Sequence, residues 1–116
     1  MMIENYLLEE LVAFAKYKTI SATAEHLSIT QPAVTRGMQK LEELLNVKLF
    51  NRTRNRITLT KTGELAAKEA EKILEMQQEF IEYVQNFNKM HYQIKIYSTS
   101  PGPQIILSQE SEFSIE

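Results

Sequence analysis

Residues 30–62 read TQPAVTRGMQKLEELLNVKLFNRTRNRITLTKT, and the first half of this stretch carries apolar residues at helical spacing. We expect a helix over about 31–45, with Pro32 tolerated in its first turn. The hydroxyl of Thr30 can cap its start, and Asn46 can end it because Asn accepts the left-handed conformation. Spacings of i, i+4, i+7 and i+11 place one apolar stripe on its buried side. The stripe consists of Val34, Met38, Leu41 and Leu45.

The second half of the stretch has the composition of β-strands. Segments 47–53 and 56–60 are rich in β-branched and aromatic residues, and the polar pair Arg54-Asn55 separates them. We therefore predict a two-stranded hairpin. Because a lone hairpin is marginally stable in water, we expect it to pack against the helices.

Two further helices are expected before the quoted stretch. The first covers residues 4–17, whose apolar side chains recur at i, i+4 and i+7. A short second helix follows, capped by Thr19 or Ser21 and ending near Leu27. The predicted fold class is mainly α, a winged helix-turn-helix of three helices plus a β-hairpin wing. The stripe of the first helix is Leu7, Leu11 and Phe14.

A long helix is predicted after the hairpin, because residues 63–90 contain no Pro and no Gly beyond Gly63. Thr60 can cap it, and roughly 27 residues span about 40 Å, which is more than a small core needs. Its apolar positions fall at heptad-like spacing, with one polar residue in a gap. These positions are Ala66, Ala70, Ile73, Gln77, Phe80, Val84 and Phe87.

The stripe of the long helix predicts a dimer. Apolar residues at helical spacing most often face the core of their own domain, but the first sixty residues can use only the first turns of this helix. The later apolar residues would then form a large exposed patch, which is unusual for a monomer. We expect residues 63–91 to act as a linker helix that pairs two chains. The expected contacts are Ala70, Ile73, Gln77, Phe80, Val84 and Phe87.

The end of the chain is expected to hold one strand and a tail. Residues 92–97, YQIKIY, predict the strand, and the turn-rich, acidic remainder predicts a disordered or loosely packed tail. The chain therefore divides into a winged helix-turn-helix at 1–62, a dimerisation helix at 63–91 and this remnant at 92–116.

The solvent face of the helix at 31–45 indicates DNA reading. Arg36 lies nearly opposite the apolar stripe. Arg can bond the O6 and N7 atoms of guanine bidentately, and Gln can bond adenine in the same way. A helix fits the major groove, and its N-terminal residues reach furthest in. The alternative is an ordinary solvated face of an amphipathic helix. The residues around Arg36 are Gln31, Pro32, Thr35, Gln39 and Lys40.

The distribution of charge favours DNA over that alternative. The net charge is −2, but residues 31–62 hold seven basic and two acidic side chains, a local charge of +5. Arg52, Arg54 and Arg56 stand within five positions of the predicted wing. Like charges so close are unfavourable unless an anionic partner is expected, and DNA phosphate or an adjacent minor groove supplies one. The predicted DNA contacts are Thr30, Gln31, Pro32, Thr35, Arg36, Gln39, Lys40, Arg52, Arg54 and Arg56.

Other classes of protein find little support in the composition. The chain has no Cys and no Asp, and its two His residues, His26 and His91, have no catalytic partner nearby in sequence. We expect neither an enzyme, nor a metal site, nor a cofactor. No run approaches the ~18 apolar residues of a membrane span, and no signal sequence starts the chain, so the expected location is cytoplasmic.

Several short motifs match a known family in order and spacing. They are TISATAEHL at 19–27, TQPAVTR at 30–36, Leu41-Glu42, Leu49-Phe50, Arg52-Thr53 and LTKTG at 59–63. Over about residues 3–97 the chain resembles the LysR-type transcriptional regulators. The resemblance implies a dimer through the linker helix, an interrupted inverted-repeat DNA site, and an effector-binding domain whose first strand is the one at 92–97. It also implies base and phosphate contacts by Gln31, Pro32, Thr35 and Arg36, with Arg52 on the DNA backbone and Arg54 or Arg56 serving the wing.

The chain departs from the family pattern at four positions. Lys18 stands where Gly is usual, and Thr23 replaces the first of two adjacent Ala residues. Gly37 replaces a longer polar residue inside the recognition helix, where close packing is a possible reason, and Asn46 replaces Gly. The effector domain is nearly all missing, so no small-molecule inducer site is expected in this chain. Either a DNA-binding fragment or a short protein without a sensor fits this pattern.

Two other interpretations stay open. An interaction module would use the helix at 63–90 to form mixed dimers with a full-length relative. A different type of winged helix would keep DNA binding but change the family, and the LTKTG junction at 59–63 favours the LysR-like interpretation.

Overall fold

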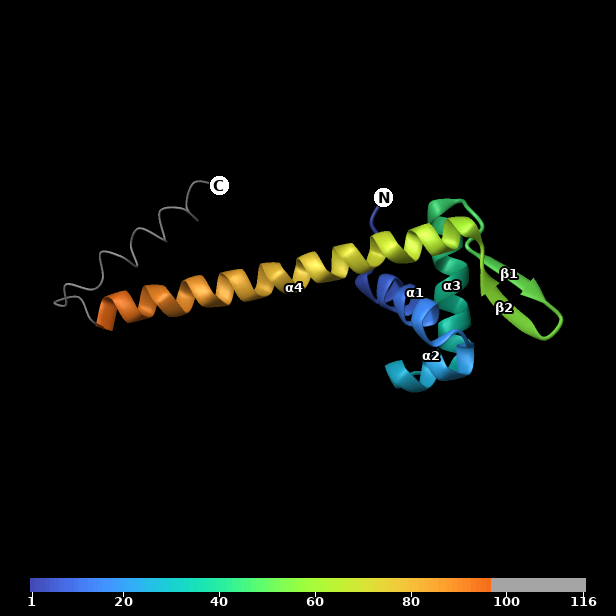
Figure 1. Ribbon diagram of the computed structural model, residues 1–116, viewed down its shortest axis with the longest axis horizontal. Coiled ribbons are helices and arrows are strands. Elements are labelled where there is room, and N and C mark those ends of the chain that lie inside the picture. The colour runs from blue at the N-terminus through green and yellow to red at the C-terminus, as the bar shows by residue number, and fades with distance from the viewer. Residues whose placement is uncertain (97–116) are drawn as a thin grey trace. The chain divides into compact units, whose positions relative to one another are not determined.

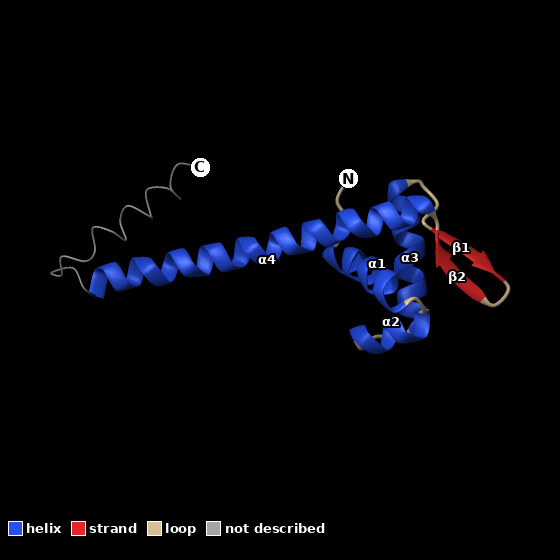
Figure 2. Cartoon of the chain, in the orientation of Figure 1, coloured by secondary structure: helices blue, strands red, loops and turns tan. Residues whose placement is uncertain are grey.

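The computed structural model describes residues 1–96. Three helices and a two-stranded hairpin precede one long helix (Figure 1). Figure 2 shows that helices dominate and that the two strands form one hairpin, as predicted. The chain divides into two compact units, Met1–Glu75 and Met76–Glu116. The elements are α1 (Asn5–Tyr17), α2 (Ile20–Leu27), α3 (Gln31–Leu45), β1 (Phe50–Thr53), β2 (Arg56–Leu59) and α4 (Lys61–Ile96).

Local capping fixes the ends of the first three helices. Thr19, rather than Ser21, caps α2, because its Oγ1 accepts a hydrogen bond from the N–H of Ala22 at 3.0 Å. The hydroxyl of Thr30 caps α3 in the same way, at 3.2 Å from the N of Ala33. Each helix ends on a residue with positive φ, and the predicted role of Asn46 is confirmed. The three residues are Lys18, Ser28 and Asn46.

The core of the first unit joins all of its elements. The apolar stripes of α1 and α3 are buried, as predicted, except that Leu45 is only half-buried. Leu49 and Phe50 at the start of the wing are fully buried, and the Phe50 ring meets Phe14 edge-on with centroids 5.6 Å apart. Ala67 of α4 closes the cluster. The wing is thus anchored to the helices by its first strand.

Thr23 places a hydroxyl at a buried position of α2, and this departure is accommodated locally. The side chain is fully buried, and its Oγ1 donates a hydrogen bond of 2.6 Å to the carbonyl of Thr19. Because the hydroxyl is paired within its own helix, it adds no unsatisfied polar group to the core.

The wing is a short antiparallel pair with Phe50 opposite Leu59 and Thr53 opposite Arg56. Strand β1 begins three residues later than predicted. Residues 47–49 instead form hydrogen bonds with α3 and with Thr60. The carboxylate of Glu42 accepts the N–H groups of Leu49 and Phe50 at 2.9 and 3.0 Å. This carboxylate ties the end of α3 to the start of the wing.

Helix α4 is capped by Thr60 as predicted, but it begins at Lys61, two residues before the predicted start, and continues further than predicted. The Thr60 hydroxyl accepts the N–H of Gly63 at 2.9 Å and so caps the helix. The strand expected at 92–97 is wrong over 92–96, where α4 continues to Ile96. A helix pairs its backbone groups internally, whereas a strand needs a neighbour, and the strands among residues 1–96 pair only with each other. Tyr97 and the expected tail at 98–116 lie outside the described residues.

No helix of residues 1–96 combines the length and the apolar character that crossing a membrane requires.

Candidate nucleic-acid interface

The outer face of α3 presents the polar residues that the sequence predicts. Gln31, Arg36 and Gln39 are exposed, whereas Thr35 is half-buried at the shoulder of the helix. Val34 on the opposite side is fully buried. Arg36 forms no ion pair with any carboxylate of residues 1–96. Its guanidinium is therefore available to an external acceptor. Thr30, Pro32 and Lys40 are exposed as well.

Lys40 differs from Arg36 because it already has an anionic partner. Its Nζ lies 2.7 Å from Oε1 of Glu4, the residue that precedes α1. The hydrogen bond to this carboxylate, reinforced by Coulomb attraction, raises the pKa of Lys40. Both side chains are about half exposed, so the pair is weak and can open. Sequence reasoning missed Glu4, because the two residues are 36 positions apart.

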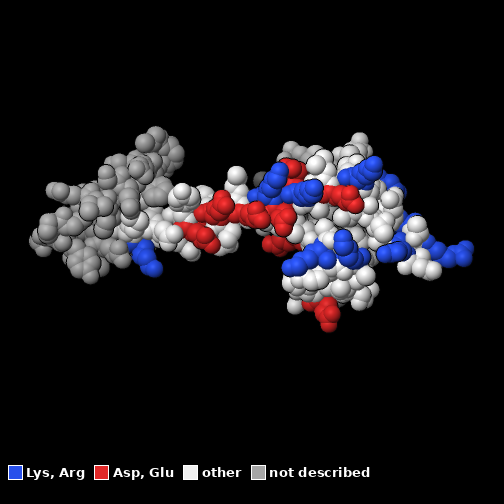
Figure 3. Space-filling view, viewed as in Figure 1, with Lys and Arg blue, Asp and Glu red and all other residues white. Residues whose placement is uncertain are grey.

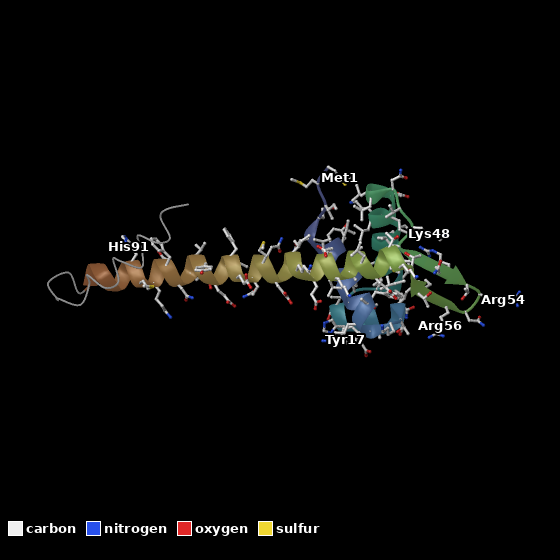
Figure 4. All side chains as sticks on the ribbon, turned by 45° about the horizontal axis from the view of Figure 1, so that its top comes forward. Met1, Tyr17, Lys48, Arg54, Arg56 and His91 are labelled. Carbon is white, nitrogen blue, oxygen red and sulfur yellow. The ribbon has the colours of Figure 1, made fainter. Side chains whose placement is uncertain are left out.

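The wing carries the three predicted arginines in exposed positions. Arg52 lies on β1, Arg54 at the tip and Arg56 on β2. Figure 4 shows Arg54 at the end of the hairpin and Arg56 along its edge. None of the three pairs with a carboxylate within the described part of the chain. Figure 3 shows Lys and Arg side chains gathered over the hairpin and the nearby helices.

A cleft of about 560 Å³ separates the wing from the turn between α1 and α2. Residues 52–57 of the wing line one side, and Lys18, Thr19 and Ile20 line the other. The sequence prediction did not assign Lys18 to the interface. The signal that could have found it is its place in the turn, where a Gly would be expected.

Gly37 of α3 packs directly on a buried carboxyl of α1. A Cβ at this position would lie 2.8 Å from Cδ of Glu10 and would overlap its Oε1, so the expected close packing is confirmed. Glu10 is only 5% exposed, and its Oε1 accepts no hydrogen bond from residues 1–96. Burial, with a smaller effect of the Glu9 charge, raises the pKa of Glu10 to about 7. Sequence reasoning missed this residue as well.

The predicted contacts on α4 fall into two groups. Ala70 is 2% exposed within the core of the first unit, so it is not free to meet a partner chain. Its spacing in the stripe serves the chain's own core, and that part of the prediction is corrected. Ile73 and Gln77 are exposed, as are Phe80 and Val84 at 67% and 52%. Phe87 is half-buried, and its ring stacks with that of His91.

The two histidines make aromatic contacts. The ring of His26 lies 4.4 Å from that of Tyr17, and His91 stacks with Phe87. Within residues 1–96, no group of three or more His, Cys, Asp or Glu side chains is placed to hold a metal ion.

Comparison with known proteins identifies the family. Residues 6–64 match the model described as "Bacterial regulatory helix-turn-helix protein, lysR family". The chain belongs to this family. The relatives include the uncharacterized HTH-type transcriptional regulator YbhD of Escherichia coli (strain K12), which is 36% identical over 84 residues. That match covers 72% of this chain and 26% of YbhD, so the chain spans about a quarter of the relative's length.

Solved structures of the lysR family share the fold. The CbnR_DBD–DNA complex matches with a TM-score of 0.69 at 32% identity, covering 72% of this chain and 97% of that one. The BenM_DBD/benA site 1 DNA complex matches with the same TM-score at 26% identity, covering 72% and 94%. The winged helix-turn-helix prediction is confirmed. The family and fold are those of transcription regulators and not of enzymes, as the sequence predicts.

Proposed function

We propose that this lysR-family chain binds double-stranded DNA sequence-specifically, as a dimer on an inverted-repeat operator. The observation that carries the proposal is the outer face of α3, where Gln31 and Arg36 are exposed. The buried residues Val34, Met38 and Leu41 lie on the other side of the helix, and Arg36 forms no ion pair within residues 1–96. Two matched structures, those of CbnR and BenM, are DNA complexes of the same fold. This similarity supports DNA as the ligand of this chain, and we assign its binding to the outer face of α3.

Base choice falls to the first turns of α3. We assign the O6 and N7 atoms of guanine to Arg36, and adenine to Gln31 or Gln39. Each good bidentate contact discriminates against the wrong base by roughly 1–3 kcal/mol. Thr35, at the shoulder of the helix, can donate its hydroxyl proton to a base edge or a phosphate. Pro32 keeps the first turn rigid beside its cap Thr30.

Cations that reach the phosphates contribute most of the affinity for DNA. Arg52, Arg54 and Arg56 have no carboxylate partners in residues 1–96, so binding DNA breaks no ion pair at the wing. Lys40 is different, because a phosphate must displace Glu4 from its ammonium. We therefore assign most of the phosphate contacts to the wing and a smaller share to Lys40.

Pairing through α4 is the second part of the proposal. Within the second unit, Phe80 and Val84 expose large apolar side chains on successive turns of one helix. A second copy covers such a face and places two recognition helices on successive turns of DNA, about 34 Å apart. The same face could also accept a full-length relative and form mixed dimers. Sedimentation at micromolar concentration should give a dimer mass, and Phe80→Glu should give a monomer. A monomer mass for the parent would contradict this part.

The test of DNA reading is selection of bound sequences from a random duplex pool at one fixed salt concentration. We expect the parent to recover an inverted repeat and Arg36→Ala to relax one position in each half-site. Lys72→Ala is the matched control, because Lys72 lies on α4 and pairs with Glu69 at 3.1 Å. It should recover the parent's sequence. Binding by the parent without any enriched sequence would leave a non-specific basic surface instead.

A further inference from the structure

The turn between α1 and α2 holds a long basic residue in an unfavourable backbone conformation. Lys18 has φ 75° and ψ −16°, and its N–H closes α1 by donating to the carbonyl of Phe14 at 2.8 Å. Side chains with a Cβ disfavour this left-handed region, which Gly enters without cost and Asn tolerates. Of the three positive-φ positions in residues 1–96, this is the one with a long charged side chain. A Gly would close the turn equally well but would carry no charge.

The surroundings of Lys18 supply a reason for a cation at this place. The residue lines the cleft of about 560 Å³ whose opposite wall holds Arg52, Arg54 and Arg56. No carboxylate lines this cleft, and none of its four cations forms an ion pair within residues 1–96. Four like charges around one cleft repel each other until an anion enters it.

One hydroxyl of the cleft is committed to the local backbone as a donor, and one is not. Thr53 Oγ1 donates to the carbonyl of Arg56 at 3.1 Å, whereas Thr19 Oγ1 accepts the N–H of Ala22 and keeps its own proton to donate. The charged donors available to a ligand are the ammonium and guanidinium groups, and the Thr19 hydroxyl can add a neutral one. Guanidinium groups bond phosphate oxygens in a fork, and ammonium groups act as point charges. Such a donor set suits a phosphodiester, which presents two charged oxygens.

We propose that Lys18 and the wing arginines together hold a backbone phosphate of the bound DNA in this cleft. The inference rests on the proposed DNA binding and extends the contact surface from α3 and the wing to the α1–α2 turn. It assigns Lys18 to affinity and not to base choice, because a phosphate carries no sequence information. On this inference, Lys18 contributes a fourth cation to the cleft, which a Gly in the same turn would not supply.

A purely structural role for Lys18 makes a different prediction. The side chain also lines the neighbouring groove that contains Glu64 and Glu71 of α4, without an ion pair to either. If Lys18 only offsets these carboxylates, its removal should lower the thermal midpoint and leave DNA binding unchanged. If it holds phosphate, its removal should weaken DNA binding without lowering the midpoint.

The experiment measures affinity for the selected operator between 50 and 200 mM NaCl. Lys18→Gly and Lys18→Gln are compared with the parent and with Lys16→Gln. Lys16 lies two residues away, over the Tyr17 ring, and does not line the cleft. Each Lys18 variant should reduce the slope of log K against log salt by about 0.9 per chain, as expected for one lost phosphate contact, with an unchanged selected sequence. Lys16→Gln should keep the parent's slope. Lys18→Gly should melt no lower than the parent, because Gly accepts the turn.

Each other outcome overturns the inference in a recognisable way. If the parent binds the operator and both Lys18 variants keep its slope, the phosphate cleft is wrong and the proposed function stands. If the parent itself binds no duplex, both fail together. A third arm adds inorganic phosphate without DNA. A phosphate-dependent rise in melting temperature that Lys18→Gln abolishes, with no change in the DNA slope, would mean that the cleft takes free anions and not the DNA backbone.

Discussion

Replacing Glu10 with Gln should remove a fall in stability between about pH 4.5 and pH 7. In the folded chain, burial raises the pKa of this carboxyl from 4.5 to about 7. The folded state therefore holds its proton over a pH range in which the unfolded state has lost it. The stabilisation linked to this group is complete below about pH 4.5, is lost as the pH rises through about 7, and changes little above that.

The magnitude follows from the same numbers. A pKa raised from 4.5 to about 7 corresponds to about 3 kcal/mol between the two ends of that range. This is an upper bound, because the carboxylate can turn toward the adjoining cleft lined by Tyr6, Arg36 and Lys40 and regain solvent there. Gln has the same shape and no titration. We expect the variant to match the parent near pH 5 and to exceed its stability by about 1–3 kcal/mol at pH 8.

The assay is urea unfolding, followed by circular dichroism at half-unit steps from pH 4.5 to pH 8. Groups that titrate equally in both proteins cancel in the difference between parent and Glu10→Gln. Glu9→Gln is the matched control, because Glu9 is the exposed neighbour whose charge adds to the shift. In Glu9→Gln, stability should still fall as the pH rises, by slightly less than in the parent. Parallel curves for the parent and Glu10→Gln would refute the reasoning, since they would mean that the buried carboxyl does not titrate in this range.

Three substitutions test how the interface is supported. Gly63→Ala should destabilise the chain by about 1–3 kcal/mol in urea unfolding, because its Cβ would press on the backbone carbonyl of Leu49. A measured cost below that range would contradict this packing. Glu42→Ala should cost about 2 kcal/mol and speed hydrogen exchange at the two β1 amides that its carboxylate accepts; unchanged exchange there would count against the tie. Gly37→Ala should stabilise the fold by about 1 kcal/mol in a Glu10→Ala background and clearly less in the parent, which a double-mutant cycle would measure. Equal changes in stability in both backgrounds would mean that the two residues do not press on each other.

Local signals were enough to predict the recognition helix and the wing. The bounds of α3 follow from a cap at Thr30, from helical spacing of its apolar residues, and from Asn46, which takes the left-handed conformation at its end. The tip of the hairpin at Arg54-Asn55 follows from a change of period on both sides. Each of these features depends on neighbours within a few positions, which a sequence pattern contains in full.

The parts that the sequence did not predict depend on contacts between distant segments. The need for Gly at position 37 becomes evident only when α1 and α3 are packed together, because the Glu10 carboxyl then occupies the place of a Cβ. Lys18 lines one cleft with wing residues more than thirty positions away. Its place in the turn marks the residue as unusual, but no local pattern indicates that the wing lies across the cleft. Ala70 is a related case. Helical spacing predicts that a residue is covered, but it does not say whether the chain's own core or a partner chain covers it.

The expected strand is wrong over residues 92–96 for a different reason. The segment has residues that suit a strand, and the family resemblance implied one. A strand satisfies its backbone groups only through a neighbouring strand, whereas a residue added to the end of an existing helix gains a hydrogen bond within its own segment. Helix α4 therefore continues to Ile96, because a helix end is available there and a partner strand among residues 1–96 is not.

The charge of the interface is set by the placement of carboxylates rather than by their number. The chain has fifteen acidic and thirteen basic residues, yet two carboxylates of the N-terminal segment that adjoin α3, Glu4 and Glu10, are either paired or buried. Glu10 is buried with a pKa of about 7, and Glu4 is held by Lys40. Arg36 and the wing arginines keep no such partners within residues 1–96. A net charge of −2 is thus compatible with a cationic face, because DNA meets the unpaired cations and not the average composition.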